Sequence, residues 1–409
     1  MSDCQACGSL LQRSFVDLGL QPLANALVDP ERAHLPDRLL PLHARVCDRC
    51  LLVQVDRDVA PDEIFSDYCY FSSFSESWVA HCAAYAEATI ERFGLGRGSQ
   101  VVEIGSNDGA LLQYFVAKAI PSLGIEPAAN VAQAAIARGV PTEVAFFGEE
   151  TAGRLVSQGR SADLIAATNV LAHVPDIHDF VRGVRTLLKP DGVFVVEFPH
   201  LLNLIREVQF DTIYHEHFTY LSLVSLRGIL ERQGLVPFDA ERQPTHGGSL
   251  RVFAARAEAG RVGSAAVQAL LDEEIAAGLD RAEGYGGFQP RAEAARDGLL
   301  AFLRDARARG ETVAGYGAAA KGNTLLNFAG ITGADLPFVV DRNPAKQGRL
   351  LPGSRIPIRP VEALIEARPD HVLILPWNLA GEVIAQLPQV GSWGGRFVTA
   401  IPEARVHAH

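Results

Sequence analysis

The 409-residue sequence contains no run of about 18 apolar residues, so it offers no candidate for a helix that crosses a membrane. Its first residues lack the basic segment and apolar stretch of a secretory leader. Basic residues are nowhere concentrated: 37 Lys and Arg stand against 48 Asp and Glu, a net charge of −11. That balance argues against binding to nucleic acid or to an anionic membrane. We therefore expect a cytoplasmic protein with neither kind of partner.

The composition, 48% hydrophobic and 21% charged, is typical of a compact folded chain, and the length suggests about three domains. A helix is predicted over 75–95, and after it apolar strand-like runs alternate with helical segments in two blocks. A mostly helical stretch, 273–310, joins the blocks. This alternation indicates parallel sheets with helices on both faces, an α/β fold. The predicted strands lie within 99–105, 121–127, 161–171, 191–199, 312–317, 336–341 and 369–377.

Four of the six cysteines form two Cys-x-x-Cys pairs, Cys4 with Cys7 and Cys47 with Cys50. In a reducing compartment two matched pairs indicate a metal site rather than disulfides. Four thiolates complete a closed tetrahedral Zn²⁺ shell, so the metal is expected to be structural. A redox Cys-x-x-Cys motif and chance clustering are the alternatives. Cys69 and Cys82 are expected to be small buried hydrophobes.

The segment 101–109 (VVEIGSNDG) ends a buried strand and opens a helix. Its glycines allow a sharp turn and the close approach of a ligand. The spacing differs from that of a dinucleotide loop and resembles the first motif of class I S-adenosylmethionine methyltransferases. An acidic residue after the next strand can accept hydrogen bonds from ribose hydroxyls. The alternative is a generic loop with a surface Glu126. The predicted cofactor-binding residues are Glu103, Gly105, Asn107, Asp108, Gly109, Glu126, Asn169 and His173.

The segment 210–220 (FDTIYHEHFTY) places two histidines, a glutamate and a tyrosine within four positions. Such a cluster suits proton abstraction, because a histidine titrates near neutral pH and a neighbouring tyrosine can donate to an oxyanion. A solvated helix face is the alternative. A zinc site of the His-Glu-x-x-His type lacks its i, i+4 spacing.

A second glycine loop, 315–320 (GYGAAA), fits Gly-x-Gly-x-x-Ala after a strand, and Asp341 closes the next strand. Taken alone, this pattern predicts a nicotinamide cofactor. Lys321 follows the loop and could instead supply positive charge for a diphosphate, with Asn323 as a further donor. Lys321 and Arg251 could also be ordinary surface cations.

Several segments together resemble the bacterial nucleotide-sugar C-methyltransferases of deoxysugar biosynthesis, over nearly the whole chain. They are the two cysteine pairs, 67–73 (DYCYFSS), 103–109, 214–218 (YHEHF), 246–251 (HGGSLR) and 315–321 (GYGAAAK). The resemblance implies S-adenosylmethionine-dependent methylation at carbon 3 of a nucleotide-linked 4-keto-6-deoxy sugar, through an enolate. It also implies that the second glycine loop belongs to a Rossmann relative that holds the nucleotide diphosphate, of thymidine or guanosine type.

By this resemblance His217 is the base, with Tyr214 and Glu216 as active-site partners and Tyr70 completing the site. His215 stays open as an alternative base, because neighbouring positions usually point in different directions. The residues expected to contact the substrate are Lys321, Asn323, Tyr316, Arg251, His246 and Asp341.

The sequence thus predicts a zinc-binding domain (1–80), a class I methyltransferase domain (81–240) and a C-terminal Rossmann-like domain (241–409). An NAD-dependent nucleotide-sugar oxidoreductase or epimerase and a sugar O- or N-methyltransferase are the alternative enzymes. A zinc-ribbon interaction protein is the non-enzymatic alternative. The sequence does not identify the sugar, its nucleotide, the group at carbon 3, the product's configuration or the oligomeric state.

Overall fold

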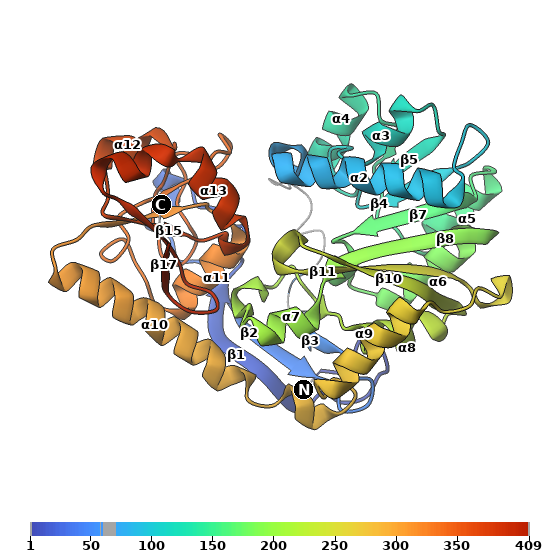
Figure 1. The fold of residues 1–409 in the computed structure, drawn as a ribbon, viewed down its shortest axis with the longest axis horizontal. Helices are drawn as coiled ribbons and strands as arrows, with labels where there is room; N and C mark the ends of the chain where they lie inside the picture. The colour runs from blue at the N-terminus through green and yellow to red at the C-terminus, as the bar shows by residue number, and fades with distance from the viewer. Residues whose placement is uncertain (1, 58, 60–70, 408–409) are drawn as a thin grey trace. The chain divides into compact units, whose positions relative to one another are not determined.

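The computed structural model describes residues 2–57, 59 and 71–407, and the chain forms two compact units (Figure 1). The units alternate along the sequence, because the second unit combines the C-terminal part of the chain with two earlier segments, Arg13–Arg45 and Asn203–His217. The first unit holds Met1–Gln12, Val46–Leu202 and Phe218–Gly284, and the second holds Arg13–Arg45, Asn203–His217 and Tyr285–His409.

The first unit contains a seven-stranded sheet in the order β10-β11-β8-β7-β4-β5-β6. In this sheet β11 is antiparallel to both neighbours, and the other strands run in one direction. The strand order reverses between β4 and β7, and open α/β sheets bind ligands beyond the carboxyl ends of their strands at such a point. The strands are β4 (Val101–Ile104), β5 (Ser122–Ile125), β6 (Thr142–Glu143), β7 (Ala162–Thr168), β8 (Leu188–Pro199), β10 (Leu235–Gln243) and β11 (Ser249–Arg256).

Helices cover both faces of this sheet, with α2, α3 and α4 on one side and α6, α8 and α9 on the other (Figure 1). Successive strand residues point to opposite faces, so Val101 packs in the cluster that includes α2 and Val102 in the cluster that includes α6. The predicted α/β class is confirmed. The helices are α2 (Glu76–Phe93), α3 (Leu112–Ala117), α4 (Ala129–Ala137), α5 (Glu149–Ser157), α6 (Ile177–Leu187), α8 (Leu223–Glu231) and α9 (Ala265–Ala276).

The second unit has a six-stranded sheet in the order β14-β13-β12-β15-β16-β17, parallel except for β17. The predicted second block of strands and helices is confirmed. Its strands are β12 (Val313–Tyr316), β13 (Val339–Val340), β14 (Ile358–Arg359), β15 (His371–Ile374), β16 (Arg396–Thr399) and β17 (Arg405–His407). Its helices are α10 (Phe288–Ala308), α11 (Ala320–Phe328), α12 (Glu362–Ala367) and α13 (Ala380–Gln386); α7 (Leu201–Arg206) contains the passage from the first unit to the second.

An N-terminal strand also packs in the second unit, which the sequence did not indicate. In β1 (Arg13–Pro22), the neighbour of β2 (Leu39–Val46), Phe15 stacks on Phe288 of α10 with ring centroids 4.5 Å apart. The division of the chain at 80 and 240 remains a prediction about its domains, and residue 240 lies inside β10.

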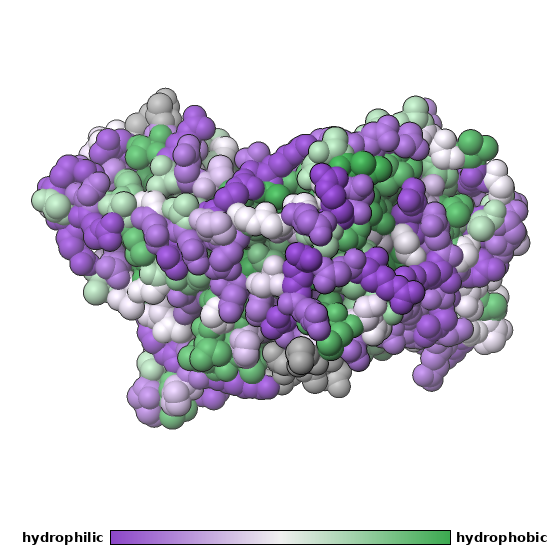
Figure 2. Space-filling view, turned by 90° about the horizontal axis from the view of Figure 1, so that it is seen from below, coloured by the Kyte–Doolittle hydropathy of each residue, from purple (hydrophilic) through white to green (hydrophobic). Residues whose placement is uncertain are grey.

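Hydrophilic residues cover most of the face shown in Figure 2, interrupted by smaller hydrophobic areas. Large apolar side chains that reach solvent include Val262 and Leu20. In the described part of the chain, no helix has both the length and the apolar character that crossing a membrane requires.

A fully buried ion pair joins β8 to two helices of the first unit. Oε1 of Glu274, on α9, lies 2.7 Å from His200 Nε2, just beyond β8. The same carboxylate accepts hydrogen bonds from the backbone N–H groups of Leu223 (2.7 Å) and Val224 (2.8 Å). These N–H groups open α8 and have no partner within the helix, so Glu274 caps α8 from a distance.

Replacing Glu274 should therefore destabilise the first unit strongly. We expect Glu274→Ala to lower the free energy of unfolding by about 3–5 kcal/mol, because it strands a buried imidazole and two N–H groups. Glu273→Ala, the neighbouring change, removes a surface ion pair with Arg242 and should cost about 0–1 kcal/mol. Urea denaturation of both variants measures the difference. Equal midpoints would contradict the capping role.

Candidate active site

The first glycine loop follows β4 and turns the chain off the sheet of the first unit. Gly105 and Gly109 have φ angles of +65° and +79°, a region that side chains rarely tolerate. A Cβ on Gly105 would lie 2.4 Å from Val170 Cγ2, and one on Gly109 would lie 2.9 Å from Val140 Cγ2. Val140 thus lies where a side chain of residue 109 would point, and the approach of a ligand to the Gly109 backbone stays a prediction.

Glu126, which follows β5, is fixed beside this loop. Its Oε2 accepts a hydrogen bond from the backbone N–H of Asn107, and its Oε1 accepts one from that of Ala128, both at 2.9 Å. The carboxylate is buried, and burial raises its pKa, although the two N–H groups lower it. Each oxygen keeps a further lone pair for a ligand hydroxyl.

Two more buried carboxylates, Glu103 and Asp108, flank the loop. Burial, then repulsion from Glu126 and Asp108, raises the pKa of Glu103. Asp108 is fully buried and pairs with Arg138 (Nη1–Oδ2, 2.8 Å). The edge formed by β4 and β5 is therefore acidic and suited to a cation.

Several buried oxygens at this edge lack a hydrogen-bond partner among the described residues. A buried polar atom without a partner is costly, so a ligand that offers donors would stabilise this region. The ammonium group and ribose hydroxyls of S-adenosylmethionine are such donors, and its sulfonium is a cation. The residues therefore fit that cofactor. The oxygens are Glu103 Oε2, Ser106 Oγ, Asp108 Oδ1, Thr168 Oγ1 and Asn169 Oδ1.

The structure brings Asn169 and His246 together at this edge. Asn169 follows β7 with a φ of 56°, and its Nδ2 lies 3.4 Å from His246 Nδ1. The His246 ring meets the Trp78 ring of α2 edge-on, at a centroid distance of 5.1 Å. His173 lies just downstream in the 3₁₀ turn Leu171–His173 and is partly exposed. A residue predicted for the substrate thus lies beside one predicted for the cofactor.

Arg251 belongs to a buried network inside the first unit. Its Nε donates to Glu197 Oε2 at 3.0 Å, and its guanidinium lies over the Tyr85 ring, 4.4 Å from the centroid. His81 Nε2 lies 2.8 Å from the other oxygen of Glu197. The sequence analysis missed Glu197 and His81, although a glutamate inside the apolar run 193–198 was a visible signal.

The four paired cysteines converge in the first unit, where all their sulfur atoms lie within 4.8 Å of one another. Cys4 and Cys50 are 3.4 Å apart, as are Cys7 and Cys47. Zn–S bonds of about 2.3 Å in a tetrahedron require sulfur separations of about 3.8 Å, so the four residues fit Zn²⁺. Four protein ligands leave no open position, so such an ion would hold the fold and not take part in the reaction.

Residues 214–217 form a tight turn in the second unit, closed by the bond from His217 N–H to the Tyr214 carbonyl (2.9 Å). Its two central side chains are buried and anchored. His215 Nε2 donates to the Pro41 carbonyl (3.2 Å), and both carboxylate oxygens of Glu216 accept from Asn25 Nδ2 (2.8 Å each). Burial raises the pKa of Glu216 to about 7, although its bond with Asn25 lowers it.

The two ends of this turn are partly exposed and meet each other. Tyr214 Oη lies 2.8 Å from His217 Nε2, and His217 Nδ1 lies 3.0 Å from the Thr212 carbonyl oxygen. A carbonyl only accepts, so Nδ1 of the neutral ring carries the proton and Nε2 carries the lone pair. This tautomer makes Nε2 the basic atom, and the Tyr214 hydroxyl donates to it.

The second glycine loop follows β12, and its second glycine is explained by packing within the protein. Gly317 has a φ of +89°, and a Cβ there would lie 2.4 Å from Pro376 Cδ. In dinucleotide sites the second glycine admits the pyrophosphate, whereas the ring of Pro376 occupies that approach in this chain. Asp341 Oδ2 accepts from the Ala318 N–H (2.8 Å), and Tyr316 is buried in β12.

Lys321 and Asn323 open α11, as the sequence suggested, but Lys321 faces protein partners. Its Nζ donates to Asn378 Oδ1 (2.7 Å) and lies 4.7 Å from the centroid of the Trp377 ring. Burial lowers the pKa of Lys321, and the charge of Asp211 opposes this. Asn323 is buried, and neither side-chain amide atom has a partner in the described part of the chain.

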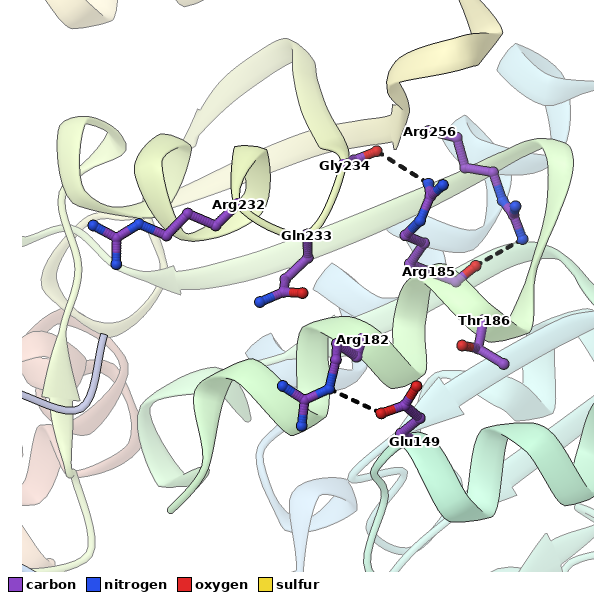
Figure 3. Close-up of a pocket in the computed structure, with 8 residues that line it drawn as sticks. All are labelled: Glu149, Arg182, Arg185, Thr186, Arg232, Gln233, Gly234 and Arg256. Atoms are coloured by element: carbon purple, nitrogen blue, oxygen red, sulfur yellow. Dashed lines mark hydrogen bonds and ion pairs between the residues drawn. The ribbon is translucent and has the colours of Figure 1, made fainter. Parts of the chain in front are cut away.

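An open groove of about 530 Å³ lies elsewhere in the first unit, beside the end of α6 and the start of β8. Figure 3 shows its arginines directed at partners: Arg185 toward the Gly234 carbonyl (3.3 Å) and Arg256 toward that of Arg185 (2.7 Å). Arg182 pairs with Glu149 (2.9 Å). These three arginines are therefore held by hydrogen bonds to backbone carbonyls and by an ion pair within the protein.

The sequence analysis also missed Asn25, Asp211, Trp377 and Asn378. Long-range partners of this kind have no local pattern, although Trp377 directly after a strand was a visible signal. Tyr70 and Cys69 lie outside the described residues, and Cys82 is buried, as expected.

Zinc content and cysteine substitution test the cysteine site. We expect one Zn²⁺ per chain by elemental analysis, and Cys47→Ser should lose the ion and unfold at a lower temperature. Cys82→Ser, which alters a buried cysteine of α2 outside the set, should keep the ion. Full zinc content in Cys47→Ser would remove that residue from the site.

Comparison with known proteins adds the last observation. The chain matches the family model of a zinc binding domain over residues 4–65, that of a methyltransferase domain over 78–238 and that of the C-methyltransferase C-terminal domain over 244–402. A ubiquinone biosynthesis O-methyltransferase of Methylobacterium sp. (strain 4-46) is 30% identical over 101 residues, 24% of this chain and 39% of that protein.

Among solved structures, the magnesium protoporphyrin IX methyltransferase of Synechocystis PCC 6803 with bound SAH is 15% identical. The alignment covers 44% of this chain and 83% of that one, with a TM-score of 0.35. A similarity this low does not bear on function. The C-methyltransferase NovU of Streptomyces niveus is 40% identical over 406 residues, 99% of this chain and 97% of that protein. Similarity over nearly the whole chain, with three domain models in sequence, shows that the protein belongs to the family of S-adenosylmethionine-dependent C-methyltransferases.

Proposed function

We propose that this C-methyltransferase methylates carbon 3 of a nucleotide-linked 4-keto-6-deoxy sugar by way of an enolate, in deoxysugar biosynthesis. The observation that carries the proposal is the Tyr214–His217 pair, in which the Thr212 carbonyl leaves the lone pair on His217 Nε2. A carbon acceptor must first lose a proton, and a neutral imidazole is a base suited to neutral pH.

In the proposed reaction the 4-keto group acidifies the hydrogen on carbon 3, and His217 Nε2 takes that proton. The electron pair of the broken C–H bond moves onto the keto oxygen. The Tyr214 hydroxyl, whose hydrogen bond occupies the lone pair of Nε2 in the free protein, turns from Nε2 to this oxygen and so frees Nε2 to take the proton. S-adenosylmethionine supplies the electrophilic methyl group. As carbon 3 forms its new C–C bond, the S–CH₃ bond breaks and leaves S-adenosylhomocysteine.

Several residues are proposed for binding. The buried amide of Asn323 has no partner among the described residues, which supports a contact with the sugar nucleotide. Lys321 would supply charge near its diphosphate. Glu216, held by Asn25, fixes the turn that carries His217. Tyr70 remains a proposed partner from the N-terminal region.

Two other reactions remain as alternatives. The packing of Pro376 against Gly317 gives no support to a nicotinamide cofactor, so we expect no tight NAD(H) binding by calorimetry. O- or N-methylation needs no enolate and hence no exchange of a carbon-bound hydrogen.

Incubation of the full-length protein with a panel of nucleotide-linked 4-keto-6-deoxy sugars tests the proposal. With S-adenosylmethionine, mass spectrometry should show the gain of one methyl group. Without it, in D₂O, the hydrogen on carbon 3 should exchange. His217→Asn should lower kcat by about 10²–10⁴-fold and abolish exchange, with cofactor affinity unchanged. His215→Asn serves as the matched control and should retain exchange. Methyl transfer without exchange would contradict the enolate. Exchange that persists in His217→Asn and is lost in His215→Asn would contradict the assigned base.

Cofactor binding should release protons. Burial raises the pKa of Glu103 and Glu126, and a bound cation favours their charged forms, so binding lowers both values. The affinity for S-adenosylmethionine should therefore rise with pH as these carboxyls ionise. Calorimetry in buffers of different ionisation enthalpy measures the released protons. Glu126→Gln should weaken binding and release fewer protons; unchanged proton release would exclude Glu126.

A further inference from the structure

The Thr212 carbonyl that orients His217 lies in a short 3₁₀ turn, Phe210–Thr212, of the second unit. This turn is packed against α11, where the Phe210 and Phe328 rings meet edge-on at a centroid distance of 5.3 Å. The direction of the Thr212 carbonyl therefore depends on what holds this turn.

The polar partner of this turn is an indole. Asp211 is fully buried, and its Oδ2 accepts from Trp377 Nε1 at 2.7 Å. Trp377 begins the 3₁₀ turn Trp377–Leu379 beyond β15, and Lys321 Nζ lies over its ring. The carboxylate and the ammonium thus lie at the edge and the face of one indole.

We propose that Asp211 and Trp377 are positioning residues that hold the Thr212 carbonyl against His217 Nδ1 and so keep Nε2 unprotonated. This inference rests on the proposed role of His217 as the base. Neither residue needs to touch the substrate, because each acts through the backbone of the turn.

The physical reason is the tautomer equilibrium of a neutral imidazole. Without an acceptor at Nδ1, the proton can occupy Nε2, and Nε2 then has no lone pair for the substrate. The bond between Trp377 and Asp211 holds the turn, so the Thr212 carbonyl stays in place as the acceptor for the Nδ1 proton. Burial raises the pKa of Asp211 to about 6, and the charge of Lys321 opposes this shift and favours the carboxylate, which is the stronger acceptor for the indole N–H.

The test compares three variants of the full-length enzyme. Trp377→Phe and Asp211→Ala remove the bond, and Asp211→Asn keeps an acceptor oxygen for the indole. Trp393→Phe is the matched control, because its indole Nε1 donates to the Pro369 carbonyl in the same unit. We expect Trp377→Phe and Asp211→Ala to lower kcat by about 10- to 100-fold with little change in KM. Asp211→Asn should lose less of its kcat than Asp211→Ala, and Trp393→Phe should keep the kcat of the unaltered enzyme.

A spectroscopic measurement separates this proposal from the proposed reaction. In protein labelled with ¹⁵N-histidine, the His217 signal, identified by its loss in His217→Asn, should show protonated Nδ1. Trp377→Phe should shift it toward a mixture of tautomers, whatever the substrate is. An unchanged tautomer in Trp377→Phe and Asp211→Ala, or a kcat loss in Trp393→Phe equal to that in Trp377→Phe, would overturn the positioning role. A shifted tautomer without any change in kcat would instead count against His217 as the base.

Discussion

The hydrogen bond between His217 Nδ1 and the Thr212 carbonyl is the constraint on which the proposed chemistry depends. A neutral imidazole has one proton for two nitrogens, so an acceptor at one nitrogen makes the other basic. The turn 214–217 buries its two central side chains and leaves Tyr214 and His217 partly exposed. The reactive pair therefore sits at the ends of an anchored turn and not on a loose loop.

The anchors of this turn come from distant parts of the chain. Asn25 is 191 positions from Glu216, and Trp377 is 166 positions from Asp211. These contacts join three segments of the second unit: the N-terminal segment 13–45, the segment 203–217 and the C-terminal part with its Rossmann-like sheet. Segments that are far apart along the chain therefore hold the turn 214–217 and the 3₁₀ turn before it from several sides.

Much of the fold could be predicted because its signals are local. Apolar runs that alternate with helical segments gave both sheets, and the cysteine spacing predicted a cluster that the structure forms. Glu126 could be proposed from the sequence because it directly follows a predicted strand. Asn25, Asp211 and Trp377 were missed because a pairing across the chain leaves no periodicity in the sequence. Gly109 has a packing role that the sequence did not reveal, because a Cβ there would meet Val140.

The three buried carboxylates Glu103, Asp108 and Glu126 also bear on how a catalytic cycle ends. Methyl transfer turns a sulfonium into a neutral thioether, so the spent cofactor has one positive charge fewer than the donor. An acidic, poorly hydrated edge holds the neutral product less firmly than the cation. If the proposed cofactor binds at this edge, the same charges that attract the donor would help the by-product to leave.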